Sequence, residues 1–185
     1  EISMERNPGY TADEVMYSWT PVINGKRTFY RSGNWGGPPD IFYGRNSGAK
    51  YRRLVDLAKE ANLNNLRIFG WHPTEVDLFY DLSDEAGITV WQDLLPIASI
   101  NLPRDRKFRD DTYVEAVACL KALRRHPCLT LLEGGEESFY GNEGLEYNVE
   151  FNVGIEGAIR PYTSLPYIPT SPLNWPPLLH EMGVG

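Results

Sequence analysis

Apolar residues follow two alternating patterns along the chain. In two stretches, residues 49–62 and 74–87, they recur three and four positions apart, which is typical of the buried face of a helix. A third helix is predicted at 110–125, where His126-Pro127 ends it. Between the helices lie short apolar runs that read as buried parallel strands. These runs are residues 28–31, 64–69, 88–91 and 128–132.

Local signals sharpen the expected element boundaries. Asn24-Gly25 predicts the tight turn of a hairpin over residues 22–31. Thr74, with Asp77 three positions later, predicts a capping box at the start of the second helix. Gly87 predicts its end, because glycine accepts the left-handed conformation that closes many helices.

The alternation of strands and helices predicts an α/β protein with a parallel sheet and right-handed crossovers. No GxGxxG turn is present, so a (β/α)₈ TIM barrel fits better than a doubly wound sheet. A whole barrel takes about 250 residues, whereas this chain has 185. We therefore expect an incomplete or truncated barrel at 21–185, lacking the last strand/helix units, and a linker from a preceding domain at 1–20.

The pattern weakens beyond residue 137, where six of the fourteen prolines fall between residues 161 and 177. A short helix is expected at 147–160, and strands at Tyr167-Ile168 and at 178–181. The last of these runs into His180-Glu181.

Charge and composition exclude several classes of function. The net charge is −7 and no Lys/Arg run forms a patch, which argues against a nucleic-acid partner. No apolar run approaches the roughly 20 residues that span a bilayer. The two cysteines are too few for a disulfide framework, and the three histidines have no metal-ligand spacing, so no metal or cofactor is expected. Nothing in the sequence indicates a compartment.

Polar and aromatic residues gather where the predicted strands end, which in a barrel is the mouth that carries the reactive groups. Each could instead be structural: a tryptophan that packs, a hydrogen-bonded histidine, or a solvated acidic turn at Glu133, Glu136 and Glu137. If they meet at one mouth, two facing carboxylates would suit glycoside hydrolysis, with Glu137 as one of them. The clusters are Asn34-Trp35, Arg67 with Trp71-His72, Trp91-Gln92-Asp93, Glu136-Glu137 and His180-Glu181.

Several of these runs occur together in a known family. The chain contains Asn65-Leu-Arg-Ile-Phe-Gly, then Phe79-Tyr-Asp-Leu leading to Val90-Trp-Gln-Asp93, then Leu123-Arg-Arg-His-Pro. In this order they resemble the catalytic barrel of glycoside hydrolase family 2, and Val90-Trp-Gln-Asp93 is most similar to its β-mannosidases. The resemblance extends from about residue 22 to residue 137.

The resemblance implies a retaining β-glycosidase that removes a non-reducing-end sugar by double displacement. Glu137 falls on the acid/base position, and Glu181, in His180-Glu-Met-Gly, is similar to the nucleophile. Glu136 falls where the family has an asparagine that holds the sugar 2-hydroxyl, and two adjacent carboxylates should raise at least one pKa. Arg67 is expected to orient a carboxylate beneath the site. The residues expected to hold the sugar are Trp35, Trp71, His72, Trp91 and Asp93.

The departure at Glu136 keeps other functions open. A carboxylate can accept from a hydroxyl but cannot donate to it. The exo-β-glucosaminidases of the family also lack the asparagine, and a β-galactosidase-like member is a further alternative. A degenerate, non-catalytic barrel fragment that binds carbohydrate is the alternative from another class. Because an open barrel exposes strand edges, a homodimer or companion domains are expected beside the carbohydrate substrate.

Overall fold

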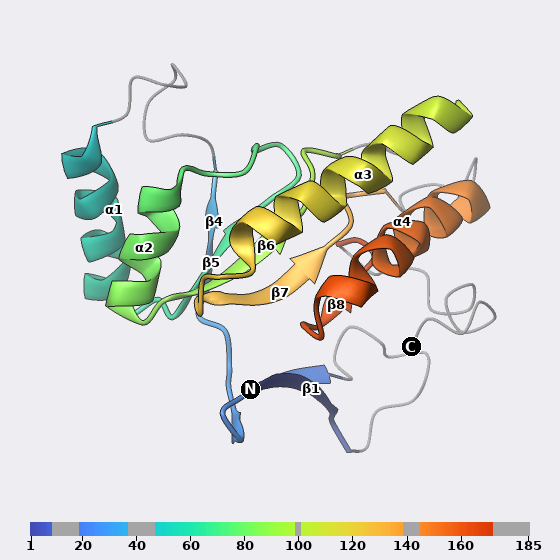
Figure 1. Ribbon diagram of the computed structural model, residues 1–185. Helices are drawn as coiled ribbons and strands as arrows, with labels where there is room; N and C mark the ends of the chain where they lie inside the picture. Colours follow the sequence, from blue (N-terminus) through green and yellow to red (C-terminus); the bar gives the residue numbers. More distant parts are fainter. Residues whose placement is uncertain (9–18, 37–46, 99–100, 139–144, 172–185) are drawn as a thin grey trace.

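The computed structural model describes residues 1–8, 19–36, 47–98, 101–138 and 145–171. Two sheets are present (Figure 1). The first is antiparallel and contains β1 (Ile2–Arg6), β2 (Trp19–Ile23) and β3 (Lys26–Arg27). The second is parallel, in the order β4 (Ser32–Trp35), β5 (Asn65–Ile68), β6 (Thr89–Asp93), β7 (Leu129–Glu133) and β8 (Tyr167–Ile168).

Helices connect the parallel strands and cover one face of the sheet (Figure 1). Strand residues Leu66, Ile68, Val90 and Leu132 are buried in one cluster with apolar residues of all four helices. The helices are α1 (Gly48–Glu60), α2 (Asp77–Ala86), α3 (Arg106–Leu123) and α4 (Leu145–Ile159), and the short 3₁₀ helix η2 (Arg160–Tyr162) follows α4. None of the helices in the described ranges is long and apolar enough to cross a membrane.

The predicted α/β alternation and the parallel sheet are confirmed. The described residues form five adjacent parallel strands, and a closed eight-stranded barrel stays a prediction. Asn24 and Gly25 both have positive φ, as the predicted hairpin turn requires, and Gly87 closes α2 at φ 68°.

Four local expectations differ from the structure. The third helix begins at Arg106 rather than at residue 110, because the Asp105 side chain caps it there. Residues 2–6, expected within an unpatterned linker, form β1, because pairing with β2 satisfies their backbone groups. The first parallel strand is Ser32–Trp35 rather than 28–31. The capping box at Thr74 is wrong, since α2 begins at Asp77 after Val76, with no side-chain cap.

The Glu75 carboxylate replaces that local cap with tertiary bonds. Glu75 is buried and accepts hydrogen bonds from Trp35 Nε1 at 2.8 Å, from the Tyr51 hydroxyl at 2.5 Å and from the Val76 amide at 3.2 Å. His72 Nε2 lies 3.2 Å from the same carboxylate. One side chain thus ties together β4, α1 and the segment between β5 and α2.

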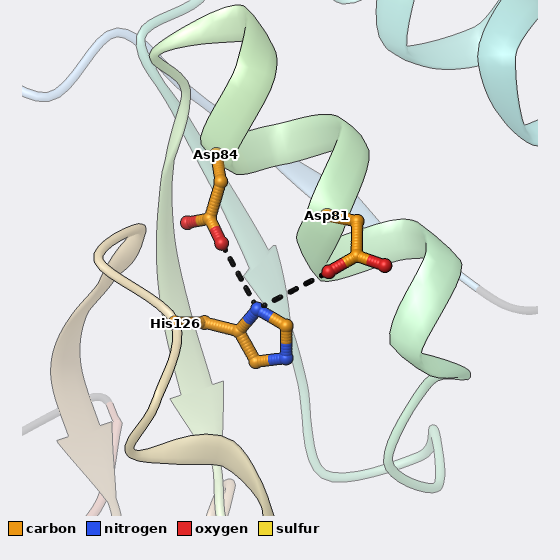
Figure 2. Close-up of side chains that lie close together, drawn as sticks. All are labelled: Asp81, Asp84 and His126. Carbon is orange, nitrogen blue, oxygen red and sulfur yellow. Dashed lines mark hydrogen bonds and ion pairs between the residues drawn. The ribbon is translucent and has the colours of Figure 1, made fainter.

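A second polar contact joins α2 to the turn before β7 (Figure 2). His126 Nδ1 lies 2.9 Å from one Asp84 oxygen, and the Cys128 amide donates to the other at 2.7 Å. Arg125 Nε donates to His126 Nε2, so Nδ1 carries the ring proton and donates to Asp84. Asp81 is exposed and lies farther from Nδ1, at 3.7 Å.

We expect Glu75→Gln to lower the unfolding free energy at pH 7 by about 1–3 kcal/mol, because an amide accepts fewer hydrogen bonds than a carboxylate. Burial alone would raise the Glu75 pKa, but the bonds from His72, Tyr51 and Trp35 outweigh burial and hold this pKa below its ordinary 4.5. The stability it contributes is therefore present above pH 4.5 and lost as the pH falls through the lowered pKa. Urea unfolding between pH 3 and 7 should show the variant and the parent converging at low pH. A constant difference at all pH values would contradict this; Glu115→Gln, on the exposed face of α3, is the control.

Asp84→Ala should lower the unfolding free energy by roughly 2–4 kcal/mol, because it leaves the His126 ring and the Cys128 amide without their acceptor. Asp81→Ala is the matched control on the same helix and should stay within about 0.5 kcal/mol of the parent. Urea unfolding measures both variants. An equal decrease in the free energy of unfolding would show that the Asp84 hydrogen bonds do not stabilise the fold.

Candidate active site

The face of the parallel sheet opposite the helices carries polar side chains. Side chains alternate between the two faces of a strand. Leu66 and Ile68 of β5 pack with the helices, and Gln92 of β6 accepts a hydrogen bond from Tyr80 of α2. Arg67, Trp91 and the residues in register with them therefore face the other side.

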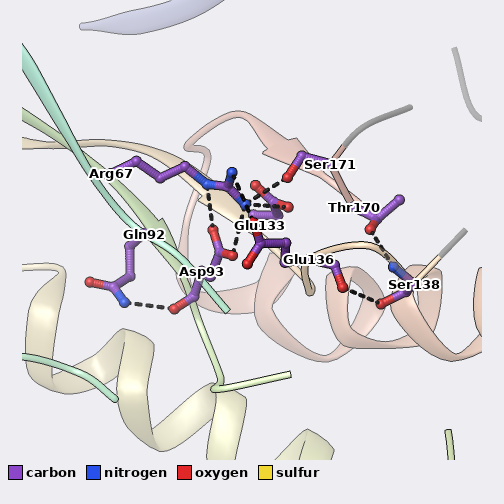
Figure 3. Close-up of polar contacts among 8 residues, drawn as sticks. All are labelled: Arg67, Gln92, Asp93, Glu133, Glu136, Ser138, Thr170 and Ser171. Atoms are coloured by element: carbon purple, nitrogen blue, oxygen red, sulfur yellow. Dashed lines mark hydrogen bonds and ion pairs between the residues drawn. The ribbon is translucent and has the colours of Figure 1, made fainter. Parts of the chain in front are cut away.

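Arg67 is the centre of this polar face (Figure 3). Its guanidinium contacts Asp93 through two nitrogens, at 3.3 and 3.0 Å, and Glu133 at 3.1 Å. It also donates to the Ser171 hydroxyl at 2.6 Å and stacks 4.7 Å from the centre of the Trp91 ring. The two-nitrogen contact with Asp93 has the paired geometry that suits a carboxylate.

Three carboxyl groups share this single guanidinium. Asp93 and Glu133 have fully buried side chains, and a Glu136 oxygen lies 3.9 Å from Arg67. Burial lowers the pKa of Arg67, but the charges of Glu133 and Asp93 outweigh it and keep this pKa above its ordinary value. Arg67 thus stays charged, and one positive charge faces three acidic groups.

The carboxyl groups respond with raised pKa values. Burial raises the pKa of Glu133 well above its ordinary range, and the Asp93 charge adds to the rise. Burial also raises the pKa of Asp93, although Arg67 opposes it. Burial also raises the pKa of Glu136; Arg67 opposes this rise, and the charges of Asp93 and Glu137 add to it. These three carboxyl groups therefore lose their protons at a higher pH than ordinary carboxylic acids do.

Glu137 follows Glu136 in an uncommon backbone conformation. Its φ is 54°, in the left-handed region that glutamate rarely adopts, and its side chain is exposed. Its amide donates to the Ser171 carbonyl at 2.7 Å, and the Glu136 amide donates to Ile97 at 2.8 Å. Because the residues on both sides are also held, at Ser138 by Thr170 and Asn148, the surrounding structure fixes this conformation.

A glycine allows the loops to close around Glu136. A Cβ atom at Gly70 would lie 2.3 Å from the Ile97 carbonyl oxygen and 2.9 Å from the Glu136 Cβ. Any larger side chain there would push the end of β7 away from the segments that follow β5 and β6.

The residues expected to hold a sugar fall into two groups. Arg67, Asp93 and Glu136 come together in the cluster of Figure 3. The guanidinium of Arg67 also lies over the Trp91 ring. Trp35 and His72 are buried in the Glu75 network instead, and Trp71 is 70% exposed. Glu181 lies outside the described residues. Binding roles for all of them stay predictions.

Sequence reasoning missed three residues: Glu133 and Ser171, which contact Arg67, and Glu75, which accepts the hydrogen bonds from Trp35 and Tyr51. Glu133 is fully buried beside Arg67 rather than part of a solvated turn, and its place at the end of the buried run 129–133 was the available signal. Ser171 reaches Arg67 from 104 positions away, and no local pattern marks it. Glu75 had no local signal either, because its partners lie on other elements.

Among the residues that the structure describes, one group has its ligand atoms close enough to hold a metal ion. It consists of Asp81, Asp84 and His126 (Figure 2). Both Asp84 oxygens and both ring nitrogens of His126 already have protein partners there. The group also precedes β7, at the end of the strand opposite Glu136. It is therefore separate from the candidate active site.

In sequence, part of the chain is similar to known β-mannosidases. No protein-family model matches the sequence. Residues of the chain are 36% identical over 116 positions to the β-mannosidase of Bos taurus and 36% identical over 120 positions to β-mannosidase A of Emericella nidulans. These matches cover 63% and 65% of this chain and 13% of each relative, so the chain spans only a small part of their length.

Solved structures agree in fold. The β-D-mannosidase of Dictyoglomus thermophilum superposes with a TM-score of 0.75 at 34% identity, over 84% of this chain and 20% of that one. The exo-chitosanase of Amycolatopsis orientalis has a TM-score of 0.69 at 19% identity, over 92% of this chain and 19% of that one, and shows the fold alone. The expected resemblance is thereby confirmed: over most of its length the chain is similar in sequence and fold to β-mannosidases.

Proposed function

We propose that this segment carries the acid/base half of the active site of a retaining β-glycosidase. The parallel sheet would form part of a (β/α)₈ barrel that removes β-linked sugars, β-mannosides first among them, from non-reducing ends. Sequence identity to β-mannosidases of 34–36% supports the substrate class. The arrangement around Glu137 supports the chemistry.

Glu137 is the observation that carries the proposal. A non-glycine residue held at positive φ costs on the order of 1–3 kcal/mol, and such residues cluster at functional sites. The strained residue here is a carboxylate, it is exposed, and it lies at the carboxyl end of β7, where barrel enzymes place their reactive groups. A buried charge cluster adjoins it. A purely structural turn would have no need for glutamate at this position.

The proposed reaction is a double displacement. The Glu181 carboxylate attacks the anomeric carbon while Glu137 donates a proton to the departing glycosidic oxygen, which leaves as an alcohol. Glu137, now ionised, then takes a proton from water, whose oxygen attacks the same carbon and frees Glu181. This mechanism requires the two carboxyl groups to lie about 5–5.5 Å apart.

The surrounding residues would position the sugar and the carboxylates. Trp91 offers an aromatic face whose plane is fixed by Arg67, and such faces suit the apolar face of a sugar ring. Exposed Trp71 would contact the sugar or the leaving group. Arg67 and Asp93, buried together, would fix the floor of the site. Trp35 and His72 would act through the Glu75 network, which positions the segment after β5.

The strand edges bear on the expected partners. Within the described residues, β4 pairs only with β5 and β8 only with β7, so each strand has one edge without a strand partner. Such edges favour pairing with another chain or a companion domain.

Glu137→Gln should lower turnover of aryl β-mannosides by roughly 10²–10⁴-fold, the usual contribution of a general acid or base. Sodium azide should restore part of it by attacking the glycosyl-enzyme, with a β-glycosyl azide as product. Unchanged turnover in this variant would remove Glu137 from the mechanism, and an α-configured azide product would rule out retention.

Glu137→Gly should separate the backbone from the chemistry. Glycine accepts positive φ, so the free energy of unfolding of this variant should equal that of the parent or exceed it by up to about 1 kcal/mol. Its turnover should still fall as in Glu137→Gln. A glycine variant that is clearly less stable would show that the Glu137 side chain is needed for folding.

The 185-residue chain alone should form a dimer, with twice its mass of 21.0 kDa, because pairing of the free strand edges buries their backbone groups. Light scattering coupled to size-exclusion chromatography measures this directly. A monomer that persists at high protein concentration would exclude the homodimer and leave companion domains as the expected partners.

A further inference from the structure

Two buried carboxyl groups lie side by side in the candidate site (Figure 3). Asp93 of β6 and Glu133 of β7 are register partners, and neighbouring strands of a sheet lie about 4.8 Å apart. Both side chains are fully buried, and both contact the same nitrogen, Nη2 of Arg67, at 3.0 and 3.1 Å. Among the described residues, Arg67 is the only basic side chain that pairs with either acid. One positive charge therefore faces two carboxyl groups that solvent does not reach.

The hydrogen bonds of these two acids are unequal. Asp93 accepts from Arg67 at both of its oxygens, through Nε at 3.3 Å and Nη2 at 3.0 Å. Glu133 accepts from Arg67 at Oε1, whereas its Oε2 is buried and has no hydrogen-bond partner within the described part of the chain. Nη2 cannot supply more, because its two N–H groups already have three acceptors, the third being the Ser171 hydroxyl. The bonds thus favour a charge on Asp93 and leave Glu133 short of a donor.

A proton on Glu133 removes this shortage. Two adjacent carboxylates in a buried site cannot both ionise readily, so such a pair keeps one proton between its members. A neutral carboxylic acid has one O–H donor, and Asp93 lies within hydrogen-bonding reach of Glu133. Burial and the Asp93 charge outweigh the effects of Arg67 and Ser171 and hold the pKa of Glu133 well above its ordinary 4.5.

The remaining titratable neighbours bring no second positive charge. Glu136, which follows β7, lies 3.9 Å from Arg67 and is itself an acid, so its charge also favours a proton on Glu133. Tyr167 of β8 lies near Glu133, and burial holds the pKa of its hydroxyl well above the ordinary 10. Tyr167 is therefore neutral at physiological pH. A proton is the neutralising group that these surroundings leave for Glu133.

We propose that Glu133 is held as a neutral acid whose Oε2 hydroxyl donates to the Asp93 carboxylate, and that it is a positioning residue of the candidate active site. Arg67 and Asp93 then form one matched pair of charges, and the Glu133 acid binds both of them. When Glu133 ionises, two anions repel each other across β6 and β7, next to Glu136. Glu133 acts through Arg67 and Asp93 and touches no substrate. The inference goes beyond the proposed function, because it requires neither a sugar nor turnover.

Infrared spectroscopy of the 185-residue chain detects the neutral acid directly. At pH 6.5 ordinary carboxyl groups, with pKa values of about 4, are ionised, so a protonated C=O band reports a buried acid. The band should disappear in Glu133→Gln, remain in Glu136→Gln, and shift when glutamate, but not aspartate, carries carbon-13. The isotope experiment uses the parent chain, so it does not depend on the folding of any variant. The absence of such a band, its survival in Glu133→Gln, or a shift with labelled aspartate alone would overturn the proposal.

Stability should depend on pH in the matching direction. The folded state keeps a proton that the unfolded chain releases above about pH 4.5, so the folded parent loses stability as the pH rises through the raised pKa of Glu133. Glu133→Gln has no such proton, and its amide can still donate to Asp93. The ratio of the unfolding constants of parent and variant should therefore rise at least about 10-fold between pH 5 and pH 9. Urea unfolding measures this ratio, and a ratio that stays constant over the range would contradict the inference.

Asp93→Asn is the matched reciprocal variant. It removes the anion that Arg67 holds through two nitrogens, so its unfolding constant at pH 6 should rise at least about 10-fold, because breaking a buried ion pair is costly. Glu133→Gln mimics the neutral acid and should stay within about 3-fold of the parent at the same pH. Glu115→Gln, on the exposed face of α3, is the control for loss of one acidic charge. A loss of stability in Glu133→Gln that equals or exceeds that in Asp93→Asn would show that Glu133 carries the charge.

Turnover decides the proposed function separately. Hydrolysis of aryl β-mannosides by a chain without the protonated band would support the glycosidase and overturn this inference. The band and the pH-dependent ratio in a chain that hydrolyses no aryl glycoside would support the inference and contradict the catalytic function.

Discussion

The structure depends on one buried guanidinium. Arg67 holds Asp93 and Glu133 by direct hydrogen bonds, reaches Ser171 and lies near Glu136, so it links β5, β6, β7 and the segment after β8. Removing a charge from water is expensive, and only several bonds together offset that cost. The same bonds fix the ends of the strands that lead to Glu136 and Glu137. The Arg67 side chain therefore holds the candidate active site in one conformation.

Two adjacent glutamates have different surroundings. Glu136 turns toward Arg67 and is mostly buried, whereas Glu137 is exposed, with its backbone at positive φ. The change of backbone conformation between them sends neighbouring carboxylates to different surroundings. One carboxyl group therefore lies near the Arg67 charge, and the other faces solvent.

Much of the fold could be predicted from the sequence, because periodicity and turn residues act locally. Local sequence alone indicated the conformation of four features. These are the strands within 64–69 and 128–132, the Asn24-Gly25 turn and the end of a helix at Gly87. The capping box at Thr74 failed because the neighbouring Glu75 found partners on β4 and α1.

Long-range contacts account for the rest of the candidate site. The clustering of Arg67, Trp91 and Asp93 follows from their places near the ends of neighbouring parallel strands, so it could be expected. Glu133 and Ser171 lie 66 and 104 positions after Arg67 in the sequence, and no local pattern indicates that they contact it. Glu181 was identified by resemblance alone and lies outside the described residues.

The spacing of the Arg67 partners also bears on how the chain reaches its native state. These partners lie 26, 66 and 104 positions further along, so the guanidinium is fully matched only after β5 to β8 have all assembled. Contacts between distant parts of a chain form slowly, since loop closure must come first. A partly assembled sheet would carry acids that lack their cation, which disfavours stable intermediates. The charge cluster thus favours cooperative assembly of β5 to β8 over partly formed sheets.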